Sequence, residues 1–471
     1  MTLVRRDIWS MSTAAKPWHR NVLAYAKAVK AMQGLPETNP RSWRYQAAIH
    51  GRAGVAPPPG APWNECQHAT WYFLPWHRMY LFQFERIVRS FVTAAGGPDD
   101  WTLPYWDYGS GAPGNALPPA FRASNLPDGS ANPLFVARRR ASVNAGTALP
   151  GPVVNTSNAL QVQVFTSQGA ATGFGGPQTG WAHQGPAFGA VEAMPHGPVH
   201  VQVGGNGGLM TDPDLAALDP IFWLHHANID RLWDVWRRRR IGNVNPTTAS
   251  WLNRRFTLRD DAGAVVRTRV RDVVDNIAQL DYTYDKLPEL PVADEGETVQ
   301  VSRRKKPVMI GRTDKGLVVG SSGAQTELPV GSMPESPGAA DAAGAAAPRL
   351  YLNLSDIEGT KNPGVVYGVY LNLPEDAGPD LRDDHLAGVV SFFGIEQAGA
   401  ADAAATGRQP HPIRYSFDIT EIVDRLQAKG AWDAAKMQVS LLPVGGAEEA
   451  QDEAAPVAEP VRVGTVSLHA G

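Results

Sequence analysis

The stretch WHRMYLFQFERIVRSFV, residues 76–92, decides how the first half of this chain folds. Its apolar side chains recur at the spacing of an amphipathic α-helix. The run Ala-Ala-Gly-Gly-Pro follows one residue later and is typical of a helix end, because glycine and proline do not continue a helix. We therefore expect a helix here with one broad buried face.

A second helix is predicted from DPIFWLHHANIDRLWDVWRRRRIG, residues 219–242. The pair Asp219-Pro220 suits a helix N-terminus, where proline costs no hydrogen bond. The four arginines at 237–240 suit the negative C-terminal end of the helix; contact with RNA is the less favoured explanation of them. Both stretches are rich in aromatic residues, so the first half of the chain is expected to form a helical core.

Composition restricts the class of protein. The 471 residues carry a net charge of −3, with 43% hydrophobic and 19% charged residues, as in an ordinary globular protein of two or three domains. No broad basic surface for nucleic acid or an acidic membrane is implied. The single cysteine excludes an internal disulfide scaffold. Neither a signal-like N-terminus nor an apolar run of membrane-spanning length is visible, so a cytoplasmic protein is predicted, and export assisted by a partner protein stays open.

Three segments are predicted from changes of pattern along the chain. Residues 1–290 are rich in Trp and His, and Gly- and Pro-rich loops between 109 and 189 run over a mainly α core. Residues 291–348 are predicted to be a linker, low in complexity from Gly323 onward. Residues 349–471 contain β-like runs such as RLYLNL and VVYGVYLNL between turn residues, the pattern of an all-β sandwich-like domain.

Histidines at ligand-like spacing gather in the first 230 residues. They are His50, His68, His77, His196, His200 and the adjacent pair His225 and His226. His196 and His200 are four residues apart and share a helix face, whereas only one of two adjacent helical residues is expected to point at a given site. One buried histidine is usually structural. Six in an apolar core instead favour two similar metals facing each other, and neutral imidazoles suit Cu, Zn, Fe and Ni.

The motifs around these histidines resemble those of the tyrosinase family. HATWYFLPWHRMYLFQFE, from residue 68, is similar to the first copper motif, and MPHGPVH followed by DPIFWLHHANIDRLW is similar to the second. LPYWDYG and YTYD match further landmarks of the family in order. The resemblance covers residues 1–290 and implies an antiparallel four-helix bundle that binds two copper ions. It implies one copper on His50, His68 and His77, and the other on His196, His200 and His226, with His225 as a neighbour.

The resemblance implies an enzyme that uses O2 to hydroxylate monophenols at the ortho position and to oxidise o-diphenols to o-quinones. Its partners would be a phenolic small molecule and O2; a homo-oligomer stays open. Glu192 matches a glutamate that orients a water to take the proton of the phenol. Gly197 stands where hydroxylating members often have asparagine, so a catechol or o-aminophenol oxidase without hydroxylation is the alternative. A haemocyanin-like oxygen carrier is less favoured, because the chain has one copper unit and no repeat.

Two more features follow from the resemblance. Cys66 precedes His68 in Cys-x-His order, which predicts a thioether between the sulfur and the imidazole; the alternative is a small buried hydrophobe. In LAGVVSFFGIE of the C-terminal domain, Phe392 or Phe393 is expected to plug the copper site, and the alternative is that one Phe faces the sandwich core and the other makes a surface contact. The segment 323–348 would let this domain swing or be cut.

The remaining residues of interest are predicted to support the site or the fold without binding a metal themselves. Asp107 and Asp230 are expected either to accept a proton from the second ring nitrogen of a ligand histidine or to be structural. Arg231, with Asp230, would tie its helix to neighbouring elements. Five histidines match no motif and are predicted to be structural or exposed: His19, His183, His385, His411 and His469.

Overall fold

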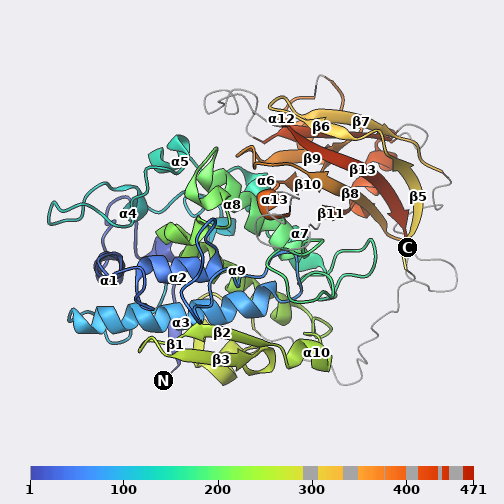
Figure 1. Ribbon diagram of the computed structural model, residues 1–471. Helices are drawn as coiled ribbons and strands as arrows, with labels where there is room; N and C mark the ends of the chain where they lie inside the picture. Colours follow the sequence, from blue (N-terminus) through green and yellow to red (C-terminus); the bar gives the residue numbers. More distant parts are fainter. Residues whose placement is uncertain are drawn as a thin grey trace.

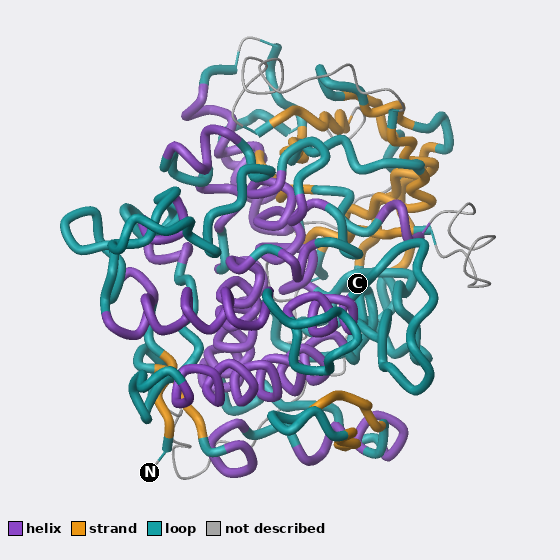
Figure 2. The backbone as a smooth tube through the Cα atoms, turned by 60° about the vertical axis from the view of Figure 1, so that its left-hand side comes forward, coloured by secondary structure: helices purple, strands orange, loops and turns teal. Residues whose placement is uncertain are grey.

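The computed structural model describes residues 2–289, 306–331, 348–375, 377–398, 412–432, 437–444 and 460–471. A helical core formed by the first part of the chain lies beside a β-rich C-terminal part (Figure 1). Figure 2 shows the helices gathered in one region, the strands mostly in another, and long loops running over both. The structure confirms the predicted order of a helical core followed by a β domain.

Five helices build the core: α1 (Arg20–Gln33), α2 (Trp43–His50), α3 (Phe73–Ala94), α8 (Gly197–Gly204) and α9 (Pro220–Arg239). The stretch that opens the sequence argument lies inside α3, which packs against α1 and α9. Phe84 of α3 stacks on Trp223 of α9. The Asp219 side chain accepts a hydrogen bond from the backbone N–H of Ile221, so α9 begins where the Asp-Pro pair predicted. The antiparallel four-helix arrangement stays a prediction.

Short elements complete the core. The helices are α4 (Pro119–Arg122), α5 (Ala141–Ala145), α6 (Gly151–Val154), α7 (Ser157–Gln161), α10 (Ala249–Leu252) and α11 (Asn276–Leu280). The 3-10 turns are η1 (Ile8–Ser10), η2 (Tyr108–Ser110), η4 (Leu209–Thr211), η5 (Ala216–Leu218) and η6 (Val270–Asp272), and η3 (Glu192–His196) is a π-helical turn. Strand β1 (Leu3–Arg5) pairs in parallel with β4 (Tyr282–Tyr284), and β2 (Arg255–Arg259) pairs antiparallel with β3 (Val265–Arg269).

Two sheets form the C-terminal domain. The four-stranded sheet has the order β10 (Leu386–Val390), β9 (Tyr367–Leu371), β12 (Met437–Pro443), β7 (Ala324–Leu328). The five-stranded sheet has the order β11 (Ile413–Asp418), β8 (Leu350–Glu358), β13 (Val461–Ala470), β5 (Val308–Thr313), with β6 (Leu317–Val319) also on β13. Helices α12 (Pro379–His385), α13 (Ile395–Ala398) and α15 (Thr420–Ala428) accompany them. Apolar residues of both sheets share one core, as in a β-sandwich.

The predicted linker of residues 291–348 is too long. Three strands, β5 to β7, lie inside it and pair with β13 and β12 of the sandwich. Sequence pattern missed them because they are short and partly exposed; in β5 only Gly311 and Thr313 are buried. The described parts of the core and the sandwich are joined through residues 290–305. Residues 332–347, most of the predicted hinge, lie outside the described residues.

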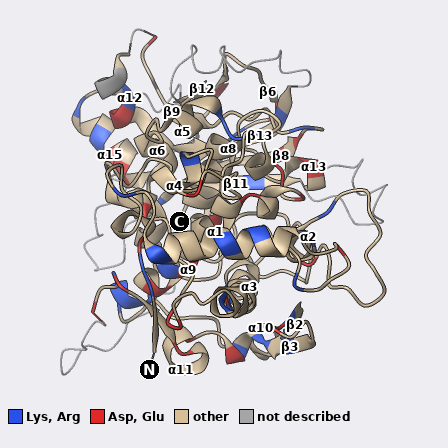
Figure 3. Ribbon diagram, turned by 90° about the vertical axis from the view of Figure 1, so that its left-hand side faces the viewer, with Lys and Arg blue, Asp and Glu red and all other residues tan. Residues whose placement is uncertain are grey.

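Charge is distributed over the surface as the composition indicates. Figure 3 shows Lys and Arg interspersed with Asp and Glu. Lys27 and Lys30 of α1 are exposed. Within the described ranges, no helix combines the length and the apolar character that crossing a bilayer requires.

Candidate metal centre

Seven buried histidines meet where the helices of the core converge. They are His50 at the end of α2, His68 before α3, His77 in α3, His196 in η3, His200 in α8, and His225 and His226 in α9. We call them the seven-histidine cluster. Each is at most 2% exposed. The structure thus brings together all six histidines that the motifs assigned to copper, and His225 with them.

Backbone carbonyl groups orient three of these rings. The Nδ1 atoms of His50, His77 and His200 each lie 2.8 Å from a carbonyl oxygen, of Pro213, Phe73 and Met210 respectively. When Nδ1 donates its proton to a carbonyl, Nε2 is left with the lone pair that binds a metal. The Nε2 atoms of His50 and His77 have no hydrogen-bond partner. These rings are therefore arranged as metal ligands are.

The ligand atoms fall into overlapping groups with spacings below 4.8 Å. One group holds His196, His200, His225 and His226; a second holds His50, Cys66 and His68; a third holds His50, His77 and His226. The Nε2 atoms of His200 and His226 lie 3.1 Å apart. Two ions could therefore be bound side by side, one nearer α2 and α3 and one nearer α8 and α9.

Burial keeps these imidazoles neutral. It lowers the pKa of all seven, since the charged form is costly in an apolar site. The pKa of His50 and of His225 falls to about 3, and for each the effect is partly offset by a backbone carbonyl. Neutral nitrogen donors without a carboxylate suit copper, and the unpartnered Nε2 atoms fit such an ion.

Cys66 lies beside two histidines. Its Sγ is 3.5 Å from Nδ1 of His68 and 3.1 Å from Nδ1 of His183. The thioether to His68 stays a prediction, and the structure adds His183 as a second neighbour. The Nε2 of His183 lies 3.7 Å from a carboxylate oxygen of Asp214. Sequence reasoning missed this contact, because 117 residues separate Cys66 from His183 and no motif links them.

Glu192 is buried at the start of η3. Its two carboxylate oxygens accept hydrogen bonds of 2.8 and 2.9 Å from the backbone N–H of Ala69, the residue after His68. Burial raises the pKa of this carboxyl well above its usual value, more than its backbone hydrogen bonds lower it. The carboxyl is therefore fixed beside the cluster and binds a proton more readily than an exposed glutamate does.

Gly197 lies against the C-terminal domain. A Cβ atom at this position would come within 2.7 Å of Ser391 Oγ and 3.5 Å of Phe393 Cβ. The room that glycine leaves is thus filled by the loop after β10.

The two phenylalanines of this loop point in opposite directions. Phe393 lies over the cluster, with its ring centroid 4.3 Å from that of His200 in a stacked arrangement and 5.5 Å from that of His68. Phe392 packs in the sandwich core, 5.7 Å from the ring of Tyr367. The φ of Phe392 is 53°, a conformation that non-glycine residues rarely adopt, and it turns the chain between the two rings. Of the two candidates, only Phe393 lies where a plug would have to be.

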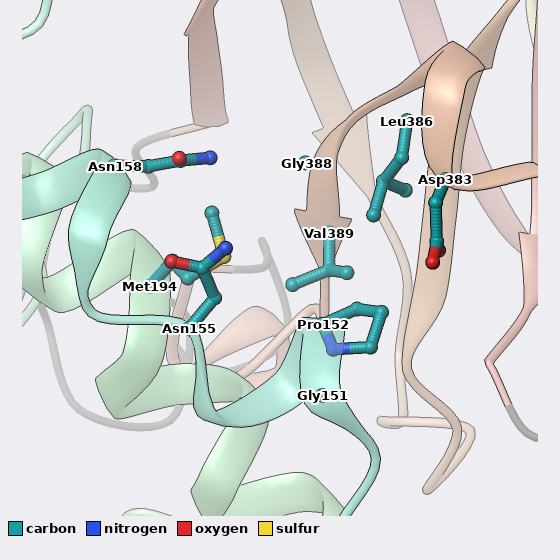
Figure 4. A pocket seen from close by; sticks show the side chains of 9 residues that line it. All are labelled: Gly151, Pro152, Asn155, Asn158, Met194, Asp383, Leu386, Gly388 and Val389. Carbon is teal, nitrogen blue, oxygen red and sulfur yellow. The ribbon is translucent and has the colours of Figure 1, made fainter. Parts of the chain in front are cut away.

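A cavity of about 310 Å³ lies on the seam between the two domains (Figure 4). Asn155 and Met194 of the core line one side, and Leu386 and Asp383 of the sandwich line the other. Met194 belongs to the same turn as His196. The seam is therefore less closely packed than a protein interior, directly beside the backbone that carries a cluster histidine.

Asp230 and Asp107 bind arginines, not ligand histidines. Asp230 accepts hydrogen bonds from Arg5 and Arg78 and from the hydroxyl groups of Tyr282 and Tyr284. These cations and hydroxyls lower the pKa of Asp230 although burial opposes the shift.

Asp107 accepts a hydrogen bond from Arg231, at 2.9 Å. The proton-accepting role suggested for both aspartates is therefore wrong. Guanidinium groups offer several donors to a buried carboxylate, whereas an imidazole offers one. The prediction that Arg231 ties α9 to its neighbours holds, since it also donates to the carbonyl of Lys286.

The histidines outside the motifs have ordinary contacts. The Nδ1 of His19 accepts a hydrogen bond from Asn21 N–H and caps α1. His385 contacts the carbonyl of Leu371, and His469 contacts the hydroxyl of Ser467. His411 lies outside the described residues.

Comparison with known proteins agrees with this geometry. The family model of the common central domain of tyrosinase matches residues 40–148 and 125–239, a polyphenol oxidase middle domain matches 245–295, and a domain of unknown function matches 306–471. A tyrosinase of Hahella sp. (strain CCB-MM4) is 34% identical over 99% of this chain and 98% of that protein. A chloroplastic polyphenol oxidase of Malus domestica is 30% identical over 55% of this chain and 45% of that protein. The structure of latent apple tyrosinase aligns with a TM-score of 0.65 at 22% identity, covering 100% of this chain and 97% of that one.

Proposed function

Because the chain belongs to the tyrosinase family of di-copper phenol oxidases, we propose that it hydroxylates monophenols at the ortho position and oxidises o-diphenols to o-quinones with O2. The observation that carries this proposal is the seven-histidine cluster, in which His226 belongs to one group of possible ligands with His196, His200 and His225 and to another with His50 and His77. His50, His68 and His77 would hold one copper, and His196, His200 and His226 the other. Copper supplies the electron transfer to O2 that no protein side chain provides.

The chain's own residues bind the phenol and manage its proton. Buried aromatic side chains around the cluster, including Phe73 and Phe222, exclude water and give the ring of the substrate an apolar surface. Glu192 acts as the base, through a water, for the phenolic proton. Its raised pKa makes it a stronger base than an ordinary carboxylate, and Ala69 N–H holds it in place.

A second candidate is a catechol or o-aminophenol oxidase that does not hydroxylate. Gly197 favours it, because glycine offers no side-chain amide to hold a water beside Glu192, and Ser391 Oγ occupies the adjoining space. A diphenol with a lower proton affinity needs less help from such a water.

The C-terminal domain would keep the enzyme latent. Phe393 stacks on His200 and is 1% exposed, so a phenol could reach the cluster only after the loop of Ser391 and Phe393 moves away. Because β5 to β7 belong to the sandwich, a cut that releases this domain has to fall in residues 290–305 and not in 323–348.

Copper content and oxygen uptake test the proposal. We expect two coppers per chain and O2 consumption with a monophenol and with the matching catechol. Activity on the catechol alone selects the second candidate, and reversible O2 binding without turnover selects a carrier. His77→Ala is expected to lose activity, whereas His385→Ala, which removes a buried histidine of the sandwich, serves as the control and retains it. A wild-type chain that binds no copper refutes the proposal.

A further inference from the structure

His225 belongs to the seven-histidine cluster, but the family pattern does not assign it to either copper. Its side chain is fully buried, and its ring contacts the backbone carbonyl of His196. The sequence predicts that only one member of the adjacent pair is a ligand, whereas in the structure donor atoms of both His225 and His226 lie in one group with His196 and His200.

The position of His225 is that of a ligand. Its ring centroid lies 4.7 Å from that of His200 and 5.4 Å from that of His196. Donor atoms of these three residues and of His226 all lie within 4.8 Å of one another. Imidazole–metal bonds of about 2.0–2.1 Å, as found at zinc, place two ligand atoms at most about 4.2 Å apart. Shifts of a few tenths of an ångström would thus bring His225 into a coordination sphere.

His226, in contrast, lies between the histidines of α2 and α3 and the histidines of η3 and α8. It belongs to the group with His196 and His200 and also to the group with His50 and His77. Its ring stacks on that of His77 at a centroid distance of 4.4 Å, closer than its 5.0 Å to His196. When His226 binds toward α3, the half-site on α8 retains His196, His200 and His225.

We propose that His225 is a copper ligand that completes a three-histidine set with His196 and His200 when His226 turns toward His50 and His77. The chain therefore has two ways to hold the second copper. His225 holds the ion during loading and whenever His226 is displaced. This inference rests on the di-copper centre proposed above and extends it by one residue.

Copper stoichiometry tests this role without relying on activity. Copper-free wild type, His226→Ala, His225→Ala and the double variant are loaded with a copper salt, freed of excess metal and analysed by mass spectrometry for copper per chain. We expect about two coppers in wild type and both single variants, and about one in the double variant. His385→Ala is the control for general damage and retains two.

A single copper in His226→Ala, or two in the double variant, overturns the proposal. If His226→Ala does not fold, as judged by circular dichroism without copper, the release rate of copper from His225→Ala to a Cu(I) chelator decides. Release of one ion at least three-fold faster than from wild type supports the role of His225, and an unchanged rate overturns it. Wild type without copper would instead refute the di-copper function itself, so the two failures are distinguishable.

Discussion

Replacement of Gly197 by alanine tests whether the sandwich keeps the enzyme closed. Gly197 has φ −59° and ψ −47°, an ordinary helical conformation. Alanine adopts this conformation without strain, so the core itself should not suffer. The added methyl group instead meets the other domain, at 2.7 Å from Ser391 Oγ.

The expected rise in the population of the open form follows from the crowding between Gly197→Ala and Ser391. A carbon at 2.7 Å from Ser391 Oγ is closer than van der Waals contact, so the Ser391 side chain or its loop has to shift. Ser391 is buried, and its carbonyl accepts a hydrogen bond from the Asn362 side chain at 3.1 Å. Overpacking of this kind costs about 1–3 kcal/mol. Because 1.4 kcal/mol is a factor of ten in an equilibrium constant, the open population should rise about 5- to 150-fold.

The assay is oxygen uptake by the full-length, copper-loaded chain with a catechol at low concentration. We expect Gly197→Ala to raise the rate toward that of an enzyme freed of its C-terminal domain. Ser391→Ala in the Gly197→Ala background removes the crowded oxygen and should restore latency. An unchanged rate with two coppers per chain, or a raised rate that Ser391→Ala does not reverse, would refute the reasoning.

Four other outcomes are expected. Phe393→Ala should raise catechol oxidation at least ten-fold, whereas Phe392→Ala should chiefly lower the melting temperature of the sandwich; equal rates for both would contradict the plug. Cleavage at a protease site inserted in residues 290–305 should raise activity on phenols and release the sandwich on gel filtration, and a released sandwich without any rise in rate argues against a lid. Intact mass of copper-matured protein should be two hydrogens below the sequence value, and alkylation of the unfolded chain should leave Cys66 unmodified; a full-mass, alkylated chain excludes the thioether. In copper-free protein, burial lowers the pKa of all seven histidines of the cluster. Below the unfolded-state pKa of about 6.5 the unfolded chain therefore binds more protons than the folded one, and the free energy of unfolding should fall as the pH decreases. Urea unfolding should show this loss between about pH 7 and 5, and a flat profile would contradict it.

Much of the core could be predicted from local pattern. The start of α9 follows from Asp219-Pro220, since a capping carboxylate and a proline favour the same position. The end of α3 at Ala94 precedes Gly96, whose φ of 69° requires the freedom of glycine. Both signals act over a few residues, which is why a single sequence contains them.

Features that depend on distant contacts escaped prediction. The partners of Asp230 lie 52 to 225 residues away, and nothing local distinguishes an arginine partner from a histidine partner. Strands β5 to β7 owe their existence to pairing with β12 and β13, which come more than a hundred residues later. The participation of His225 depends on where α8 lies relative to α9, and spacing within α9 does not contain that information.

The parallel pairing of β1 with β4 has a consequence for the order of events during synthesis. Arg5 is buried against Asp230 and beside the ring of Tyr282, so the core can close only after the ribosome has made residue 284. The larger sheet of the sandwich needs its central strand β13, which ends at Ala470. At about 5–20 residues per second, these 186 further residues take about 10–40 s. Until β13 is made, we expect the histidines of the core to lack the cover of Phe393, so metal ions should enter most freely in this interval.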